Sequence, residues 1–196
     1  MKLKSHANGI GEVFFTSDHH FGHRSVIDMC DRGFENVEAR DSHMIDSWNA
    51  VVRPRDVVFH LGDFAHRCPP ERLGRIFHQL HGQKHLILGN HDKKHTQSLP
   101  WISQQQMAHI TVDEQQIHLC HYGMRVWPGM WRKAVHLYGH SHGRLPGNSM
   151  SMDIGVDAIG YYPLAVEHIK AKLAQLPSMV FPEELDEGEE FEVPAP

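Results

Sequence analysis

The sequence contains no apolar run near the length of about 20 residues that a helix needs to cross a bilayer. The first residues have a basic tip without an apolar stretch behind it, so the sequence does not indicate a secretory signal. Cysteine is scarce: Cys30, Cys68 and Cys120 are an odd number without paired spacing. We therefore expect a cytoplasmic protein with free thiols, and neither a membrane protein nor a disulfide-stabilised secreted one.

Lysine and arginine are absent from residues 177–196, a segment that contains seven acidic residues. Because the formal charge of −5 for the whole chain includes −7 from this segment, residues 1–176 carry +2. We expect one domain over residues 1–176 and an acidic, disordered or loosely docked tail over 177–196. A body this weakly basic does not by itself indicate a nucleic-acid-binding protein.

Apolar runs and helix-period segments alternate through the first half of the chain, and 196 residues suffice for a sizeable core. The predicted strands are 13–17, 56–61 and 85–88, and the predicted helices begin at Asp41, as a cap, and at Pro70. This alternation is typical of an α/β protein, with functional side chains at the carboxyl ends of its strands.

The second half has a different pattern. Two short runs at 109–112 and 117–120 predict a hairpin with a four-residue loop, and a closing helix is expected after Pro163.

Metal-ligating residue types follow several of these apolar runs, where each predicted strand ends. The runs are Asp18-His19-His20, Gly62-Asp63, Gly89-Asn90-His91-Asp92, His121 and Gly139-His140-Ser141-His142. Packing does not require Asp, Asn and His after one strand after another, whereas a divalent metal requires oxygen and nitrogen donors that converge from separate elements. Because the donors outnumber the four ligands of a tetrahedral ion, we predict a site for two metals.

Each run has a simpler interpretation when it is taken alone. Gly62-Asp63 is typical of a turn after a strand, and a single histidine such as His121 is more often packed or at the surface than bound to metal. The segment 139–142 is also compatible with a solvent-exposed loop. The prediction of a metal site therefore depends on the five runs occurring together and in order.

In this order and spacing the runs resemble the motifs D-x-H, G-D, G-N-H-D, H and G-H-x-H of the calcineurin-like binuclear metallophosphoesterases. The resemblance extends over residues 14–176, and the flanking segments FFTSDHHFGHRSVI and LYGHSHG resemble a small bacterial and phage-borne branch of that family. It implies a four-layer α/β sandwich, in which two sheets pack face to face with helices outside.

The resemblance also implies a ligand set for two divalent ions. Asp63 would bridge the ions; Asp18, His20 and His142 would complete one site, and Asn90, His121 and His140 the other. This mixture of oxygen and nitrogen donors suits manganese, iron or zinc better than magnesium or calcium. Manganese is our first expectation, and nickel and cobalt are further candidates.

The implied reaction is hydrolysis of a phosphate ester by attack of metal-bound hydroxide, without a covalent phosphoenzyme. His91 would protonate the leaving group or stabilise the transition state, and Asp92 would orient its imidazole. Arg24, Arg125 and Arg144 lie beside the motifs and are candidates for binding phosphate oxygens.

Several substrate classes remain open. We favour diesters slightly over monoesters, and a single-strand nuclease is an alternative; a non-catalytic scaffold is the weakest, because every ligand and His91 are present. The partner we expect is therefore a phosphate ester, including nucleotides and nucleic acid. His19 and His23 are further candidates for substrate contact, His60 for support of the site, and Trp127 and Trp131 for base stacking.

Overall fold

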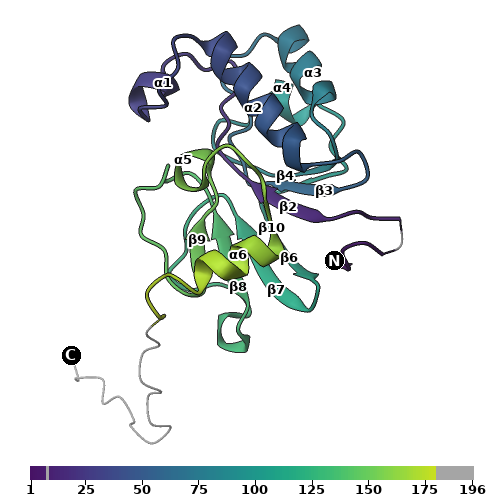
Figure 1. Cartoon of the computed structure of the whole chain (residues 1–196), viewed down its shortest axis with the longest axis vertical. Coiled ribbons are helices and arrows are strands. Elements are labelled where there is room, and N and C mark those ends of the chain that lie inside the picture. Colours follow the sequence, from purple (N-terminus) through teal and green to yellow (C-terminus); the bar gives the residue numbers. More distant parts are fainter. Residues whose placement is uncertain (8, 180–196) are drawn as a thin grey trace, which may run out of the picture.

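The computed structural model describes residues 1–7 and 9–179 (Figure 1). They form two five-stranded sheets whose apolar faces share one core, and helices lie over the outer face of the first sheet. The predicted α/β class, with two packed sheets flanked by helices, is confirmed. Residues 180–196 of the predicted acidic tail lie outside the described residues, and the domain boundary at 176 stays a prediction.

The first sheet supplies three of the predicted ligand loops. Its strand order is β10-β2-β3-β4-β5, and all neighbours are parallel except β10, which is antiparallel to β2. The strands are β2 (Val13–Thr16), β3 (Val57–His60), β4 (Gln83–Ile87), β5 (Ser103–Gln105) and β10 (Leu164–Ala165). Because β2, β3 and β4 run in the same direction, the loops that contain Asp18, Asp63 and Asn90 leave the sheet at one edge.

The second sheet supplies the other two ligand loops. Its order is β1-β6-β7-β8-β9, and only the β6–β7 pair is antiparallel. The strands are β1 (Lys2–Leu3), β6 (Met107–Val112), β7 (Gln115–Cys120), β8 (Val135–Tyr138) and β9 (Ser151–Asp153). Since β7 and β8 are parallel, His121 and His140 emerge from the same end.

The hairpin loop between β6 and β7 is shorter than predicted. Val112 pairs with Gln115, so the loop contains two residues where four were expected. Asp113 and Glu114 both have positive φ, 46° and 70°, which is the backbone that a tight two-residue hairpin requires. The polar sequence hid the start of β7, because Gln115 and Gln116 belong to this strand.

Two apolar clusters hold the layers together. Between the sheets, Phe15 and Phe59 of the first pack with Leu119 and Leu137 of the second, and α6 (Val166–Leu173) joins this cluster. On the outer face of the first sheet, Val58 packs against the helices α2 (Val37–Val51) and α3 (Pro70–Gln79). The short helices are α1 (Val26–Met29), α4 (Lys94–Gln97), α5 (Val156–Ile159) and the 3₁₀ helix at Met130–Arg132.

The loop 121–134 covers part of the outer face of the second sheet, where the buried Trp127 ring lies 5.4 Å from the His136 ring. The Trp127 indole N–H donates to the Ala134 carbonyl at 2.7 Å. No helix in the described part of the chain is both long and apolar enough to cross a membrane.

Helix α2 begins earlier than predicted. Its cap is Asn36, whose side-chain oxygen accepts a hydrogen bond from the Ala39 N–H at 2.8 Å. Asp41, the expected cap, lies inside the helix, and its carboxylate accepts from the Gly22 N–H at 3.0 Å. The residue type was suited to capping, but its carboxylate is used to tie α2 to the first ligand loop.

Candidate metal centre

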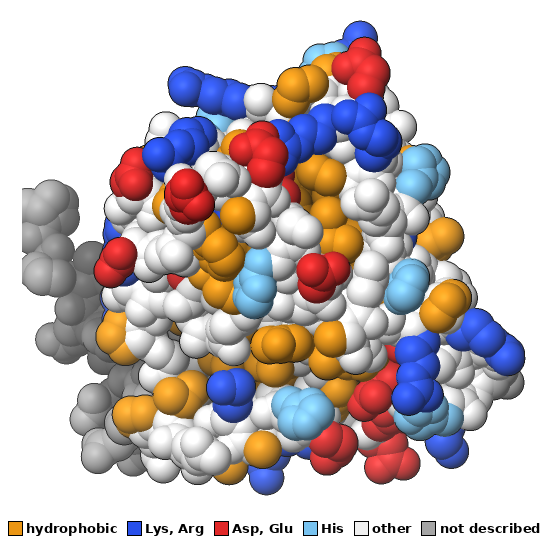
Figure 2. All heavy atoms as spheres, turned by 45° about the horizontal axis from the view of Figure 1, so that its top comes forward, with side chains coloured by type: hydrophobic (Ala, Val, Ile, Leu, Met, Phe, Trp, Pro, Cys, Tyr) orange, Lys and Arg blue, Asp and Glu red, His pale blue; other side chains and the backbone are white. Residues whose placement is uncertain are grey.

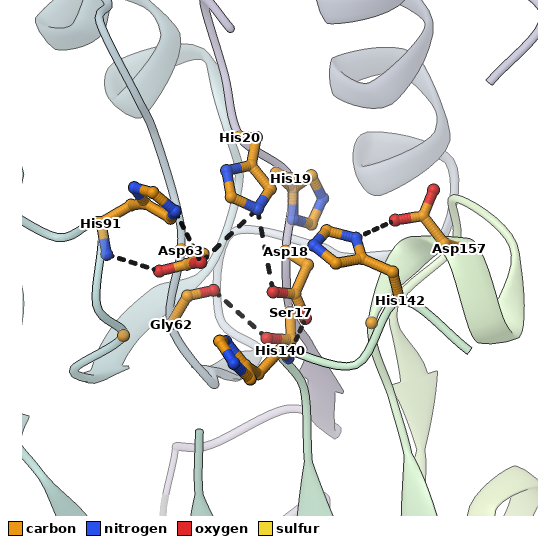
Figure 3. Close-up of polar contacts among 12 residues, drawn as sticks. Ser17, Asp18, His19, His20, Gly62, Asp63, His91, His140, His142 and Asp157 are labelled. Atoms are coloured by element: carbon orange, nitrogen blue, oxygen red, sulfur yellow. Dashed lines mark hydrogen bonds and ion pairs between the residues drawn. The ribbon is translucent and has the colours of Figure 1, made fainter. Parts of the chain in front are cut away.

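The loops from both sheets bring the predicted ligands together in one place (Figure 3). Three groups of described residues have their potential ligand atoms within 4.8 Å of one another, and two of them consist of predicted ligands: Asp18, His20 and His142 in one, and Asp63, His121 and His140 in the other. Asn90 joins the second group, because its side-chain oxygen lies 3.2 Å from His121 Nε2. The grouping matches the two predicted ligand sets, and ligation itself stays a prediction.

Asp63 lies between the two groups. Its Oδ2 is 3.5 Å from His20 Nε2 and also 3.5 Å from His121 Nε2, so one oxygen faces a donor from each group. Its Oδ1 accepts from the His91 N–H at 2.8 Å, which fixes the carboxylate plane. A carboxylate in this position is suited to bridging two cations, and the negative charge offsets their mutual repulsion.

The backbone at the ligands is unusual. Five of the predicted ligands have positive φ, a region that L-residues rarely adopt: Asp18 at 61°, His20 at 52°, Asp63 at 55°, His140 at 64° and His142 at 50°. Such conformations cost about 1–3 kcal/mol each and persist where the surroundings over-determine them, typically at functional sites. Their concentration at this cluster is independent support for a functional site.

Gly62 shows how closely the ligand loops approach each other. Its φ is 96°, and a Cβ at this position would lie 2.6 Å from His121 Nδ1 and 2.7 Å from Gly89 Cα. Any side chain would therefore push apart the loops that carry Asp63, Asn90 and His121. The glycine before Asp63 is required by both its conformation and this contact.

Two buried arginines hold the first ligand loop by its carbonyl groups. Arg32 donates to the carbonyls of Asp18 and His19 at 2.8 and 2.9 Å. Arg40 donates to the carbonyls of His20 and His23 at 2.9 and 2.5 Å. Neither arginine was predicted to belong to the site, because each acts on backbone atoms from a distant part of the sequence and no motif marks it.

Hydrogen bonds fix the tautomers of two predicted ligands. His121 Nδ1 donates to the Leu61 carbonyl at 2.7 Å, and His142 Nδ1 donates to Asp157 Oδ2 at 2.6 Å. Both acceptors lack a proton to donate, so Nδ1 carries a proton in each ring, and Nε2 is the atom that can bind a metal once it loses its own proton. Asp157 also forms a bidentate pair with Arg32, at 2.8 and 2.7 Å, and no sequence motif indicates this role.

The residues present fit a pair of divalent cations. Asp18 Oδ1 and His20 Nε2 are buried without a hydrogen-bond partner among the described residues, an arrangement that a bound cation would satisfy. Burial raises the pKa of Asp18 to about 7, although His121 and His142 oppose the shift. Burial also acts to raise the pKa of Asp63, but the hydrogen bond and charge of His121 outweigh it and hold that pKa well below its usual range.

Replacing Asp18 by Asn is expected to stabilise the metal-free protein and to weaken metal binding. The folded-state pKa of about 7 exceeds the ordinary aspartate pKa of 3.8, so the ionised carboxylate is disfavoured in the fold. The resulting destabilisation is fully present above the folded-state pKa and disappears as the pH falls toward the unfolded value. Asp18→Asn should therefore gain up to about 4 kcal/mol near pH 8 and clearly less near pH 5.

Denaturant unfolding in the presence of a chelator measures this difference. Asp28→Asn is the matched control, because that side chain is 78% exposed and its replacement should change stability by no more than about 0.5 kcal/mol. An Asp18→Asn protein that is no more stable than wild type near pH 8 would contradict the assignment of Asp18 as a strained, buried carboxylate.

The two residues of the predicted catalytic pair have different surroundings, and the catalytic role of His91 stays a prediction. The His91 side chain is 35% exposed, and its Nε2 lies 4.0 Å from Asp63 Oδ2, so the ring borders the cluster. Asp92 does not orient this ring. Its carboxylate accepts from the N–H groups of Gly89, Asp63 and Phe64 at 2.8, 2.9 and 3.0 Å, and it thereby joins the second and third ligand loops.

The predicted substrate arginines have other contacts. Arg24 lies 3.6 Å from the exposed Asp28 carboxylate, and Arg144 donates to the Met29 carbonyl at 2.9 Å. Arg125 lines a separate hollow of about 510 Å³ together with Trp131. Phosphate binding by these three arginines stays a prediction.

The structure also shows the surroundings of Trp127 and His60, the candidates for base stacking and for support of the site. Trp127 is 3% exposed, so its ring does not offer a stacking face and base stacking by this residue is wrong. His60 supports the site from behind, since its Nε2 lies 3.0 Å from Nδ1 of the equally buried His19.

Comparison with known proteins gives relatives for less than half of the chain. No protein-family model matches it. An uncharacterised protein of Methanocaldococcus jannaschii is 37% identical over 83 residues, which cover 42% of this chain and 47% of the relative. The Gene 66 protein of Mycobacterium phage D29 is 38% identical over 89 residues, 44% of this chain and 43% of that protein. The chain thus matches under half the length of these curated relatives.

Solved structures align with a larger part of the chain. A protein of unknown function from Aquifex aeolicus has a TM-score of 0.65 at 22% identity, covering 82% of this chain and 98% of that one. An Escherichia coli phosphoesterase has a TM-score of 0.38 at 19% identity, covering 74% of this chain and 78% of that one. An archaeal phosphodiesterase has a TM-score of 0.43 at 16% identity, covering 74% and 82%. The first likeness establishes the fold alone.

Proposed function

We propose that this chain is a phosphoesterase that depends on two divalent metal ions and prefers diesters. The observation that carries the proposal is the position of Asp63 Oδ2, which lies 3.5 Å from a histidine of each ligand group. The positive φ angles at five ligand positions and the buried, unpartnered donors add support. Two-metal sites built from such donors are typical of phosphoryl-transfer enzymes.

When bound, the ions would polarise the phosphoryl oxygen and lower the pKa of water from about 15.7 toward ~7. The protein's own residues then have three tasks. Asp63 holds the two ligand groups together, His91 borders the cluster where it can donate a proton to the departing oxygen, and Asp92 fixes the loop between them. The mixed donor set favours manganese, and iron, zinc, nickel or cobalt are alternatives.

The preference for diesters is supported by the openness of the site. His140 is exposed and His91 is one-third exposed, so both ester groups of a substrate could extend from the cluster into solvent. On the face shown in Figure 2, basic side chains gather across the top, with acidic side chains between them.

A panel of phosphate esters assayed with different metals tests the proposal. Protein treated with a chelator should be inert on every substrate, and manganese should restore hydrolysis of a diester such as bis(p-nitrophenyl) phosphate more than of p-nitrophenyl phosphate. Asn90→Ala protein purified in the same way controls for a contaminating enzyme, because it should lose most of the activity. Activity that survives metal removal, or that equals wild type in Asn90→Ala, would refute the proposal.

A further inference from the structure

Two histidines outside the ligand set extend the site away from the predicted metals. The ring centroid of His66 lies 4.3 Å from that of His91 and 4.5 Å from that of His23. The His20 ring completes the group, 5.7 Å from His23 and 5.3 Å from His91. His23, His66 and His91 are each partly exposed, so a row of three imidazoles continues outward from the ligand His20.

The backbone holds this imidazole row in place without using its ring nitrogens. The His66 N–H donates to the Phe21 carbonyl at 3.2 Å, and Arg40 binds the His23 carbonyl. Gly22 has a φ of 80°, and a Cβ there would lie 2.5 Å from Cys68 Cβ, so the two loops touch directly. Meanwhile His23 Nδ1 is buried and has no hydrogen-bond partner among the described residues.

Positive charge flanks the row. Arg67 follows His66 and Lys93 follows Asp92 in the sequence, and both side chains are exposed. Burial lowers the pKa of His66, and the charges of His91 and Arg67 lower it further; Lys93 also contributes. Burial lowers the pKa of His23, and the charge of Arg67 acts in the same direction, so this ring also lies near a cation.

We propose that His23, His66 and Arg67, with Lys93 at the edge, form a subsite for a second phosphate group of the substrate, next to His91. Ring N–H donors beside flexible cations suit the several oxygens and the charge of a phosphate, whereas a neutral sugar would not require the cations. The subsite rests on the proposed function, because it narrows the proposed substrates from any phosphate diester to diesters with a neighbouring phosphate group. Such a phosphate occurs in an oligonucleotide or in a nucleoside polyphosphate.

Equilibrium binding tests the subsite independently of catalysis. Calorimetry on manganese-loaded protein would compare thymidine 5′-monophosphate with thymidine 3′,5′-bisphosphate, which resembles a strand, and with thymidine 5′-diphosphate. At least one two-phosphate ligand should bind about ten-fold more tightly than the monophosphate, as expected for a hydrogen bond to a charged group. The two-phosphate ligand with the larger gain in affinity over the monophosphate shows whether the second phosphate belongs to a strand or to a polyphosphate.

Single substitutions then test which side chains provide this gain in affinity. Arg67→Gln and His66→Gln should each remove most of the ten-fold advantage, and Arg67→Lys should retain part of it. Arg53→Gln is the matched control, because Arg53 is exposed and precedes β3, at the opposite end of that strand from Asp63. Equal affinity for all three ligands, or an advantage that survives in both Gln variants, would overturn the subsite. If the advantage behaves as expected in a protein that hydrolyses no ester, the proposed function fails and the subsite stands.

Discussion

Asp63→Ala is expected to empty both metal sites and to lower ester hydrolysis by at least about 10³-fold, a loss of several kcal/mol of transition-state stabilisation. The reason is geometric, because Asp63 Oδ2 faces His20 Nε2 and His121 Nε2 at the same distance of 3.5 Å. Asn90→Ala should instead weaken mainly one site, since Asn90 contacts only the second group through His121. Mass spectrometry of dialysed protein measures the metal content of each variant.

A second variant separates metal loss from misfolding. Asp63 Oδ1 also accepts from the His91 N–H, and Asp63→Asn keeps an oxygen at this position while it removes the charge. Asp63→Asn should fold cooperatively and still fail to hold two ions. If Asp63→Ala retained two equivalents of metal, Asp63 would not be the bridge.

His91→Ala should reduce hydrolysis of an alkyl or nucleoside ester by about 10²–10⁴-fold, the usual cost of losing a general acid. The same variant should hydrolyse a p-nitrophenyl ester almost normally, because p-nitrophenolate leaves without a proton. Its metal content should match wild type, since His91 belongs to neither group of potential ligands. The measurement is the ratio of kcat/KM for the two ester types, with the exposed His78→Ala on α3 as the control.

The two ways in which this prediction can fail have different meanings. Equal losses on both ester types would indicate that His91 binds the transition state without donating a proton. Loss of metal in the same variant would make His91 a ligand.

The strands that carry the site were predictable because apolar runs and ligand types alternate in the sequence. Thus β3 lies within its predicted range, β4 begins two residues before its predicted range, and the loops at Asp63 and Asn90 follow these strands. Short-range patterns reveal such features, since both the strand and the ligand that follows it are encoded within a few residues. The start of α2 was missed because Asp41 is a good cap residue that serves a tertiary contact instead.

The supporting residues were not predictable in this way. Arg32, Arg40 and Asp157 act through contacts with residues far away in the sequence, and the type of each residue alone is typical of a solvated surface. Asp92 was interpreted as a partner for His91 because the two are adjacent. Three backbone N–H groups surround its carboxylate in the fold, and they satisfy it more completely than one imidazole could.

Anomalous diffraction from crystals of the manganese-loaded protein tests the binuclear centre most directly. The account predicts two manganese peaks roughly 3.5–4 Å apart, the usual spacing in two-metal sites, with Asp63 between them. One peak should lie beside Asp18, His20 and His142, and the other beside Asn90, His121 and His140. A single peak at full manganese occupancy, or two peaks that do not share Asp63, would contradict it.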